Sequence, residues 1–80
     1  MPVFFIHTLT GDMIAEDDEG INMPSLEEAH AMAIVSAREL LADNIKSASA
    51  TPLKAVIITD ETGKELMTIL AKDVLPEPLK

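Results

Sequence analysis

One long amphipathic helix is the feature that most constrains the fold of this 80-residue chain. The segment Pro24-Ser25-Leu26-Glu27-Glu28 has the pattern of a capping box, in which Ser25 is the N-cap and Glu28 reaches back to it. The helix is expected to run from Leu26 to near Ser47, where a small polar stretch and Pro52 end it. At about 100° per residue, six apolar side chains fall on one stripe of this helix. They are Leu26, Ala29, Ala33, Ala37, Leu40 and Leu41.

Segments rich in aromatic and β-branched residues lie on both sides of the helix and are predicted to be strands. Before it come 3–10 and 13–16, joined by a hairpin turn at Gly11, and 21–23 adds a few extended residues. After it come 53–59 and 65–71, joined by a turn at 60–63. The predicted order is β-β-α-β-β, an α+β domain with one helix packed on a small antiparallel sheet. Residues 1–75 are expected to form this single domain and residues 76–80 a frayed tail.

The size of the chain leaves a thin margin of stability. Eighty residues support one hydrophobic core, and a domain this small buries only about two-thirds of its unfolded surface. Because the chain has no cysteine, neither disulfides nor thiolate metal sites can add to its stability. Good packing or self-association must therefore supply it. The absence of cysteine, of a targeting segment and of a long apolar run leads us to expect a cytoplasmic protein.

Charge is distributed very unevenly along the chain, whose net charge is −8. The first 37 residues contain no lysine or arginine. The negative potential of this segment repels phosphate and anionic lipid, so a membrane surface is not an expected partner. Nucleic acid is not expected either, because the chain also has only two aromatic side chains on which bases could stack. The seven carboxylates of this segment are Asp12, Glu16, Asp17, Asp18, Glu19, Glu27 and Glu28.

The predicted strands are apolar on both faces, although a single helix can cover only one. In the first strand, for example, Phe4 and Ile6 oppose Val3 and Phe5. A homodimer that packs sheet to sheet would cover the second face. A different protein partner, a ligand, or a strongly coiled sheet closed by the helix and the tail would also do so. The candidate interface residues are Phe4, Ile6, Val56, Ile58, Met67, Ile69, Met32 and Val35.

The acidic turn and two histidines are the candidates for metal or acid–base chemistry. Five carboxylates between Asp12 and Glu19 could attract a hard cation, but their spacing is not that of an EF-hand, so a solvated turn is expected. His7 should share a sheet face with Phe5, and His30 lies close to the core stripe of the helix. The two could approach each other and form a metal or acid–base site with a neighbouring carboxylate. We expect instead that each histidine has a structural role and is held by hydrogen bonds.

No catalytic motif is present. The serines and threonines lack the pattern of a nucleophile, and the three glycines are isolated turn residues that form neither a phosphate loop nor a dinucleotide fingerprint. The sequence therefore predicts a protein that is not an enzyme and needs no cofactor.

Several short motifs in order carry a resemblance that extends to about Leu75. They are Met1-Pro2-Val3-Phe4-Phe5-Ile6-His7, 17–21, 24–29, 37–43 and 60–66. The chain resembles an uncharacterised family of short proteins, frequent in alphaproteobacteria, that opens Met-Pro-x-Phe/Tyr-Phe-Phe-His and is known only as a domain of unknown function. This chain departs from that pattern at Ile6 and in a longer stretch between the helix and the third strand. The resemblance implies no activity, cofactor or catalytic residue.

A looser resemblance covers about 25 residues around Gly20 and the helix entry Ser25-Leu26-Glu27-Glu28-Ala29. This region is similar to the N-terminal domain of HicB-type antitoxins, which implies an acidic module that shields a basic protein. Three functional hypotheses therefore remain: a homodimeric, non-enzymatic interaction module, an antitoxin-like module, and a protein that binds a small ligand or divalent metal through His7, His30 and the acidic turn.

Overall fold

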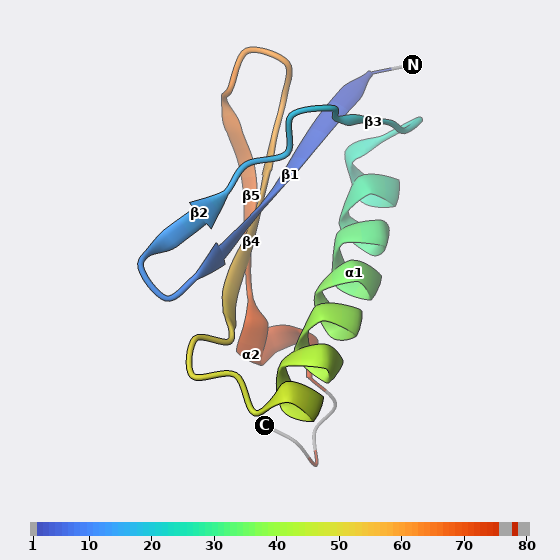
Figure 1. Cartoon of the computed structure of the whole chain (residues 1–80). Helices are drawn as coiled ribbons and strands as arrows, with labels where there is room; N and C mark the ends of the chain where they lie inside the picture. The colour runs from blue at the N-terminus through green and yellow to red at the C-terminus, as the bar shows by residue number, and fades with distance from the viewer. Residues whose placement is uncertain (1, 76–77, 79–80) are drawn as a thin grey trace.

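The computed structural model describes residues 2–75 and 78 and confirms an α+β arrangement, with an antiparallel sheet and one long helix (Figure 1). The predicted pair of hairpins around a central helix is present, and a short second helix follows the last strand. The elements are β1 (Val3–Thr10), β2 (Met13–Ala15), β3 (Ile21–Asn22), α1 (Leu26–Ser47), β4 (Leu53–Thr59), β5 (Glu65–Leu70) and α2 (Ala71–Val74).

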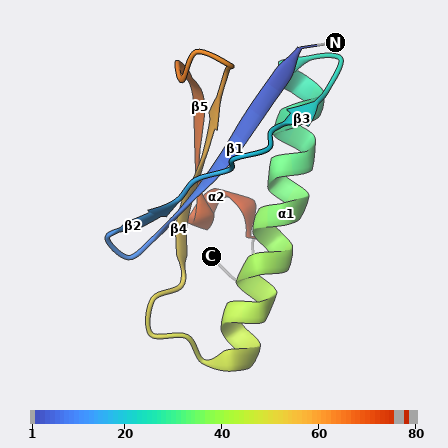
Figure 2. The ribbon, with the colours of Figure 1, turned by 45° about the horizontal axis from the view of Figure 1, so that its top comes forward.

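The sheet has the strand order β2-β1-β4-β5, and every pairing is antiparallel. The strand β1 is the longest and has two partners on its outer edge. There β2 pairs with the end of β1 at residues 8–10, and β3 pairs with its start at residues 3–4. The middle of β1 is left without a strand on this side, and the connection between β2 and β3 runs past it (Figure 2).

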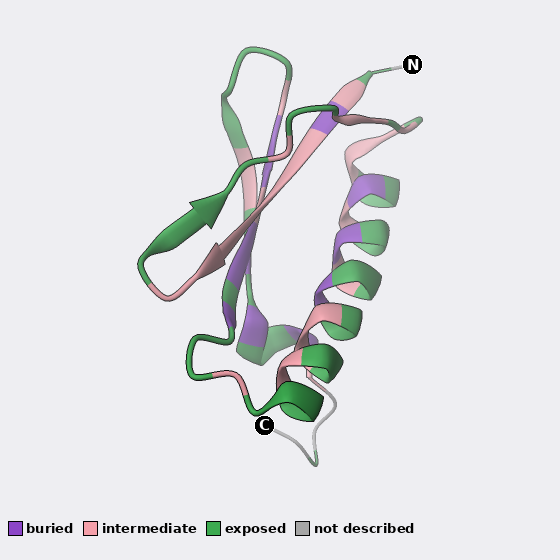
Figure 3. Cartoon of the chain, in the orientation of Figure 1, coloured by how far each residue is buried: buried purple, intermediate pink, exposed green. Residues whose placement is uncertain are grey.

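The helix α1 begins and ends where the sequence predicts. Ser25 accepts a hydrogen bond from the backbone N–H of Glu28 (3.3 Å), which satisfies one of the free donors of the first turn. At the other end Ala48 takes a left-handed conformation (φ 52°) that closes the last turn. The predicted stripe is confirmed: its three alanines are fully buried, and its leucines are partly buried against the same core (Figure 3). Alanine lets the helix backbone approach the sheet closely.

The chain end differs from the expected strand at 65–71, since β5 stops at Leu70 and α2 follows. Val74 of α2 is buried in the main core, and its carbonyl accepts a 2.8 Å hydrogen bond from Nε of Arg38 on α1. The sequence does not predict α2, because four residues are too few to show the 3.6-residue repeat of a helix. The apolar Ala71 instead continues the apolar run of β5, so the pattern assigns it to the strand. The tail expected at 76–80 lies outside the described residues, except for Pro78.

The register shows which face of the sheet α1 covers, and it reverses the expected choice of interface. Ile6 is paired with Ile58, and Ile58 with Met67, so all three share one face. This face is buried beneath α1: Phe4, Val56, Ile58 and Ile69 belong to the same core cluster as the three alanines. These four residues, named above as interface candidates, are core residues within one chain, and the candidates Ile6 and Met67 are partly buried and pack against that core. The second face is formed by their neighbours in sequence. Of the two remaining candidates, Met32 is 39% and Val35 53% exposed on the helix.

Candidate functional site

A row of apolar side chains crosses the face of the sheet that carries no helix. Leu9 of β1 is paired with Ile14 of β2 on one side and with Ala55 of β4 on the other. Ala55 is paired in turn with Leu70 of β5. Both α1 and α2 pack on the opposite side, where Ala71 and Val74 join the core cluster. Ile14 and Leu70, at the two ends of the row, are 54% and 43% exposed. We call Ile14, Leu9, Ala55 and Leu70 the apolar row.

The apolar row is continued by a second line of side chains that is less apolar. His7, Ile57 and Thr68 are paired across β1, β4 and β5. The His7 ring stacks on that of Phe5 at a centroid distance of 6.4 Å and an angle of 7°. This confirms that the two rings share a face, as predicted. Towards the far end of this face, Glu65 accepts a 2.9 Å hydrogen bond from Thr68. The face therefore grades from apolar at the β1–β2 turn to polar at the β4–β5 turn.

The connection between β2 and β3 is held by Asp17, which takes the place of a strand along the middle of β1. One carboxylate oxygen of Asp17 accepts from the backbone N–H of Ile6 (3.2 Å). The other accepts from the N–H groups of Glu19 and Gly20 (both 3.1 Å). Gly20 has φ +75°, and a Cβ there would lie 2.7 Å from Cγ1 of Val3, so only glycine fits. This turn is more than the solvated acidic loop expected, because Asp17 is part of its framework.

His7 joins this turn to the sheet. Its Nδ1 accepts a 3.0 Å hydrogen bond from the backbone N–H of Asp17, and its Nε2 lies 3.1 Å from Oγ1 of Thr59. Because a backbone N–H can only donate, Nδ1 carries no proton in this arrangement, and Nε2–H donates to Thr59. The expected structural, hydrogen-bonded role of His7 is therefore confirmed. Protonation of Nδ1 would remove the acceptor that Asp17 uses.

Asp17 keeps its negative charge because of its hydrogen bonds. Burial raises the pKa of its carboxyl, but the hydrogen bonds from the N–H groups of Gly20, Ile6 and Glu19 outweigh burial. The pKa therefore lies below the ordinary 3.8. The stability that the ionised carboxylate contributes is complete above this ordinary value. It is lost as the pH falls below 3.8 and through the lower pKa of the folded state.

Replacing Asp17 with asparagine should destabilise the fold. In Asp17→Asn one oxygen becomes an NH₂ group, so one of its backbone donors, the N–H of Ile6 or those of Glu19 and Gly20, faces another donor. An unsatisfied half-buried donor costs about 1–2 kcal/mol, which lowers the Tm by roughly 5–10 °C for a domain of this size. Thermal unfolding followed by circular dichroism measures this. The matched control is Asp18→Asn, which removes the same charge from an exposed neighbour. Equal Tm values for the two variants would contradict the framework role.

The structure does not bring the candidate metal ligands together. His7 lies on the face away from the helices, whereas His30 is half-buried on α1, which covers the opposite face. Within residues 2–75 and 78, no three histidine, aspartate or glutamate side chains are arranged to hold a metal ion. Nothing in the sequence distinguishes Asp17, among five similar carboxylates, as the one whose side chain accepts a hydrogen bond from β1. Asp17 differs from the other four only because the connection between β2 and β3 places it beside the middle of β1.

Comparisons with known proteins identify the family and no relative of known function. The family described as Domain of unknown function (DUF6894) matches residues 3–71, so the chain belongs to this family. This confirms the resemblance to an uncharacterised family. No curated protein matches the chain, and neither does any solved structure. In the described part of the chain, no helix has the length and apolar character needed to cross a membrane.

Proposed function

We propose that this protein is a non-enzymatic interaction module that forms a homodimer through the uncovered face of its sheet. The observation that carries the proposal is the apolar row, in which β2, β1, β4 and β5 each contribute an apolar residue at the same level. An antiparallel sheet that faces water on one side normally alternates to polar residues there. Here Ile14 and Leu70 are exposed instead, at the two ends of the row, while Leu9 is half-buried and Ala55 is buried between its neighbours. A partner that lies across the row would cover both exposed ends at once.

A second copy of the chain suits this face better than a charged partner does. Two chains of net charge −8 repel each other over most of their surface, and they can approach closely only where charge is absent. The apolar row is such a place, since its four residues are uncharged. In the neighbouring line of His7, Ile57 and Thr68, the histidine is the one ionisable side chain. In a two-fold dimer the same patch is used by both copies, so an apolar row can pack on itself.

The size of the chain is compatible with this arrangement. A standard interface takes about 800 Å² from each partner. The whole accessible surface here is 5347 Å². The face offers four strands side by side, each about 4.8 Å from the next. Covering this face would also bury more apolar surface in a domain whose own core is small. Self-association is one way in which a small chain without disulfides gains stability.

The proposed dimer should become tighter as salt is added. Its contact is apolar, while the long-range force between two acidic copies is repulsive and is screened by ions. Sedimentation equilibrium of the full chain, from about 0.05 M to about 0.5 M NaCl, is expected to show a dimer whose dissociation constant falls severalfold. A monomer at both salt concentrations would overturn the proposal. So would a dimer that dissociates as salt rises, because that behaviour indicates an interface held by ion pairs.

A further inference from the structure

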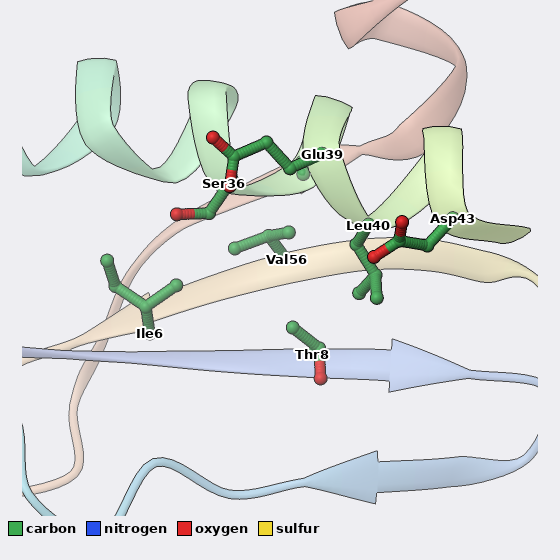
Figure 4. Close-up of a pocket in the computed structure, with 8 residues that line it drawn as sticks. Ile6, Thr8, Ser36, Glu39, Leu40, Asp43 and Val56 are labelled. Atoms are coloured by element: carbon green, nitrogen blue, oxygen red, sulfur yellow. The ribbon is translucent and has the colours of Figure 1, made fainter.

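A groove runs along the other side of the sheet, between α1 and β1. It has a volume of about 290 Å³ (Figure 4). The groove exists because α1 lies mainly over β4 and not over β1: Val56 and Ile58 of β4 are fully buried, whereas Ile6 and Thr8 of β1 stay partly exposed. The lining residues are Ile6, Thr8, Ser36, Ala37, Glu39, Leu40, Asp43 and Val56.

The floor of this groove is apolar and its rim is acidic. Ile6, Leu40 and Val56 form the floor, while the carboxylates of Glu39 and Asp43 lie on the helix side (Figure 4). The residues that line the groove include no lysine or arginine. Two carboxylates next to an apolar wall generate a stronger negative potential than they would in open water. The groove is therefore suited to a group that has a positive charge and an apolar body.

We propose that this groove binds an arginine-bearing segment of a basic partner protein. Glu39 and Asp43 are four residues apart on α1 and so project from the same side of the helix, with Cβ atoms about 6 Å apart. A guanidinium group has five donors in a planar fork, so it can bond to a carboxylate through two parallel hydrogen bonds, which an ammonium group cannot do. The aliphatic stem of the arginine packs on Ile6, Leu40 and Val56.

The groove is separate from the face proposed for dimerisation. Ile6 and Val56 are on the helix side of the sheet, whereas Leu9 and Ala55 of the apolar row are on the opposite side. A dimer formed through the apolar row leaves both grooves open. Failure of the one proposal is therefore distinguishable from failure of the other.

The test uses the full chain and a synthetic peptide of alternating arginine and leucine, with binding measured by fluorescence anisotropy. The double variant Glu39→Gln/Asp43→Asn is expected to bind the peptide at least tenfold more weakly than the unmodified protein. The matched control Asp18→Asn/Glu61→Gln loses the same charge from exposed turns outside the groove, and its binding should change by less than about threefold. Replacing each arginine of the peptide with neutral citrulline should abolish binding.

Two results would overturn the proposal. One is equal weakening in the two double variants, since that would mean that the peptide responds only to net charge. The other is an amide NMR map in which the peptide perturbs residues of the apolar row and leaves Ile6, Thr8 and Leu40 unchanged. Peptide binding should also weaken with salt, which is the opposite of the trend expected for the dimer.

Discussion

Replacing Ile14 with glutamate is expected to weaken the homodimer about 100-fold. Ile14 is 54% exposed in the single chain and lies at one end of the apolar row, so its substitution leaves the core untouched. In a two-fold dimer each substitution occurs twice. Losing the burial of one isoleucine costs about 1.5 kcal/mol, and two such losses correspond to roughly a hundredfold in Kd. The negative charge adds repulsion between copies that are already acidic. Sedimentation equilibrium gives the two dissociation constants.

The neighbouring residue provides the matched control. Met13 lies in the same short strand and is 74% exposed, but it points to the other face, because its partner is Thr10 and not Leu9. Met13→Glu therefore adds the same charge beside the proposed interface without entering it, and should change Kd by only a fewfold through long-range repulsion. If the two variants weaken the dimer equally, the contact does not use the apolar row. If Ile14→Glu has no effect, the uncovered face is not the interface.

Local signals explain why the start of the helix could be predicted to the residue and its end to near Ser47. Ser25 and Glu28 define its start through a hydrogen bond between residues three apart, and the alanine stripe needs only the helical repeat. The turn at 60–63 is equally local: the side chain of Asp60 accepts from Thr62 and Lys64 within the turn itself. In each case the interacting groups are neighbours in the sequence, so the sequence contains the whole interaction.

The choice of sheet face could not be predicted, because alternation alone does not distinguish two apolar faces. Phe5 is as apolar as Ile6, and Ile57 as apolar as Ile58. The face that α1 covers depends on how the chain enters and leaves the helix, and that is a property of the whole topology. The sequence therefore indicates two apolar faces, and the sheet residues chosen from it as interface candidates lie on the face that α1 covers. The groove could not be predicted either, because it depends on the position of α1 over β4 and not over β1, which is also a property of the whole topology.

Asp17 was unpredictable for a related reason. Its partners Ile6 and His7 are ten or more residues away, and they come within reach only because β2 and β3 leave a gap along β1. In sequence it is one acid among several. In the structure it replaces a missing strand, and its neighbour Asp18 does not.

Substituting Ile58 with alanine should cause the largest loss of stability in the chain. Ile58 is fully buried at the centre of the sheet, between Ile6 and Met67 on the face beneath α1. Removing three methyl or methylene groups there loses their burial and leaves a cavity, at a cost of about 2–5 kcal/mol. For a domain of this size the Tm should fall by roughly 10–30 °C, as measured by circular dichroism.

The adjacent variant Ile57→Ala turns this measurement into a test of both faces. Ile57 is half-buried on the uncovered face in one chain, so in the monomeric Ile14→Glu background its loss should cost about 1 kcal/mol. Without Ile14→Glu, where the proposed dimer covers Ile57, the cost should be larger and should grow with protein concentration. Ile58→Ala should cost the same in both backgrounds, because α1 covers Ile58 within its own chain. If Ile57→Ala and Ile58→Ala are equally costly in the monomeric background, something within the chain already covers both faces, and the sheet has no face free for a partner.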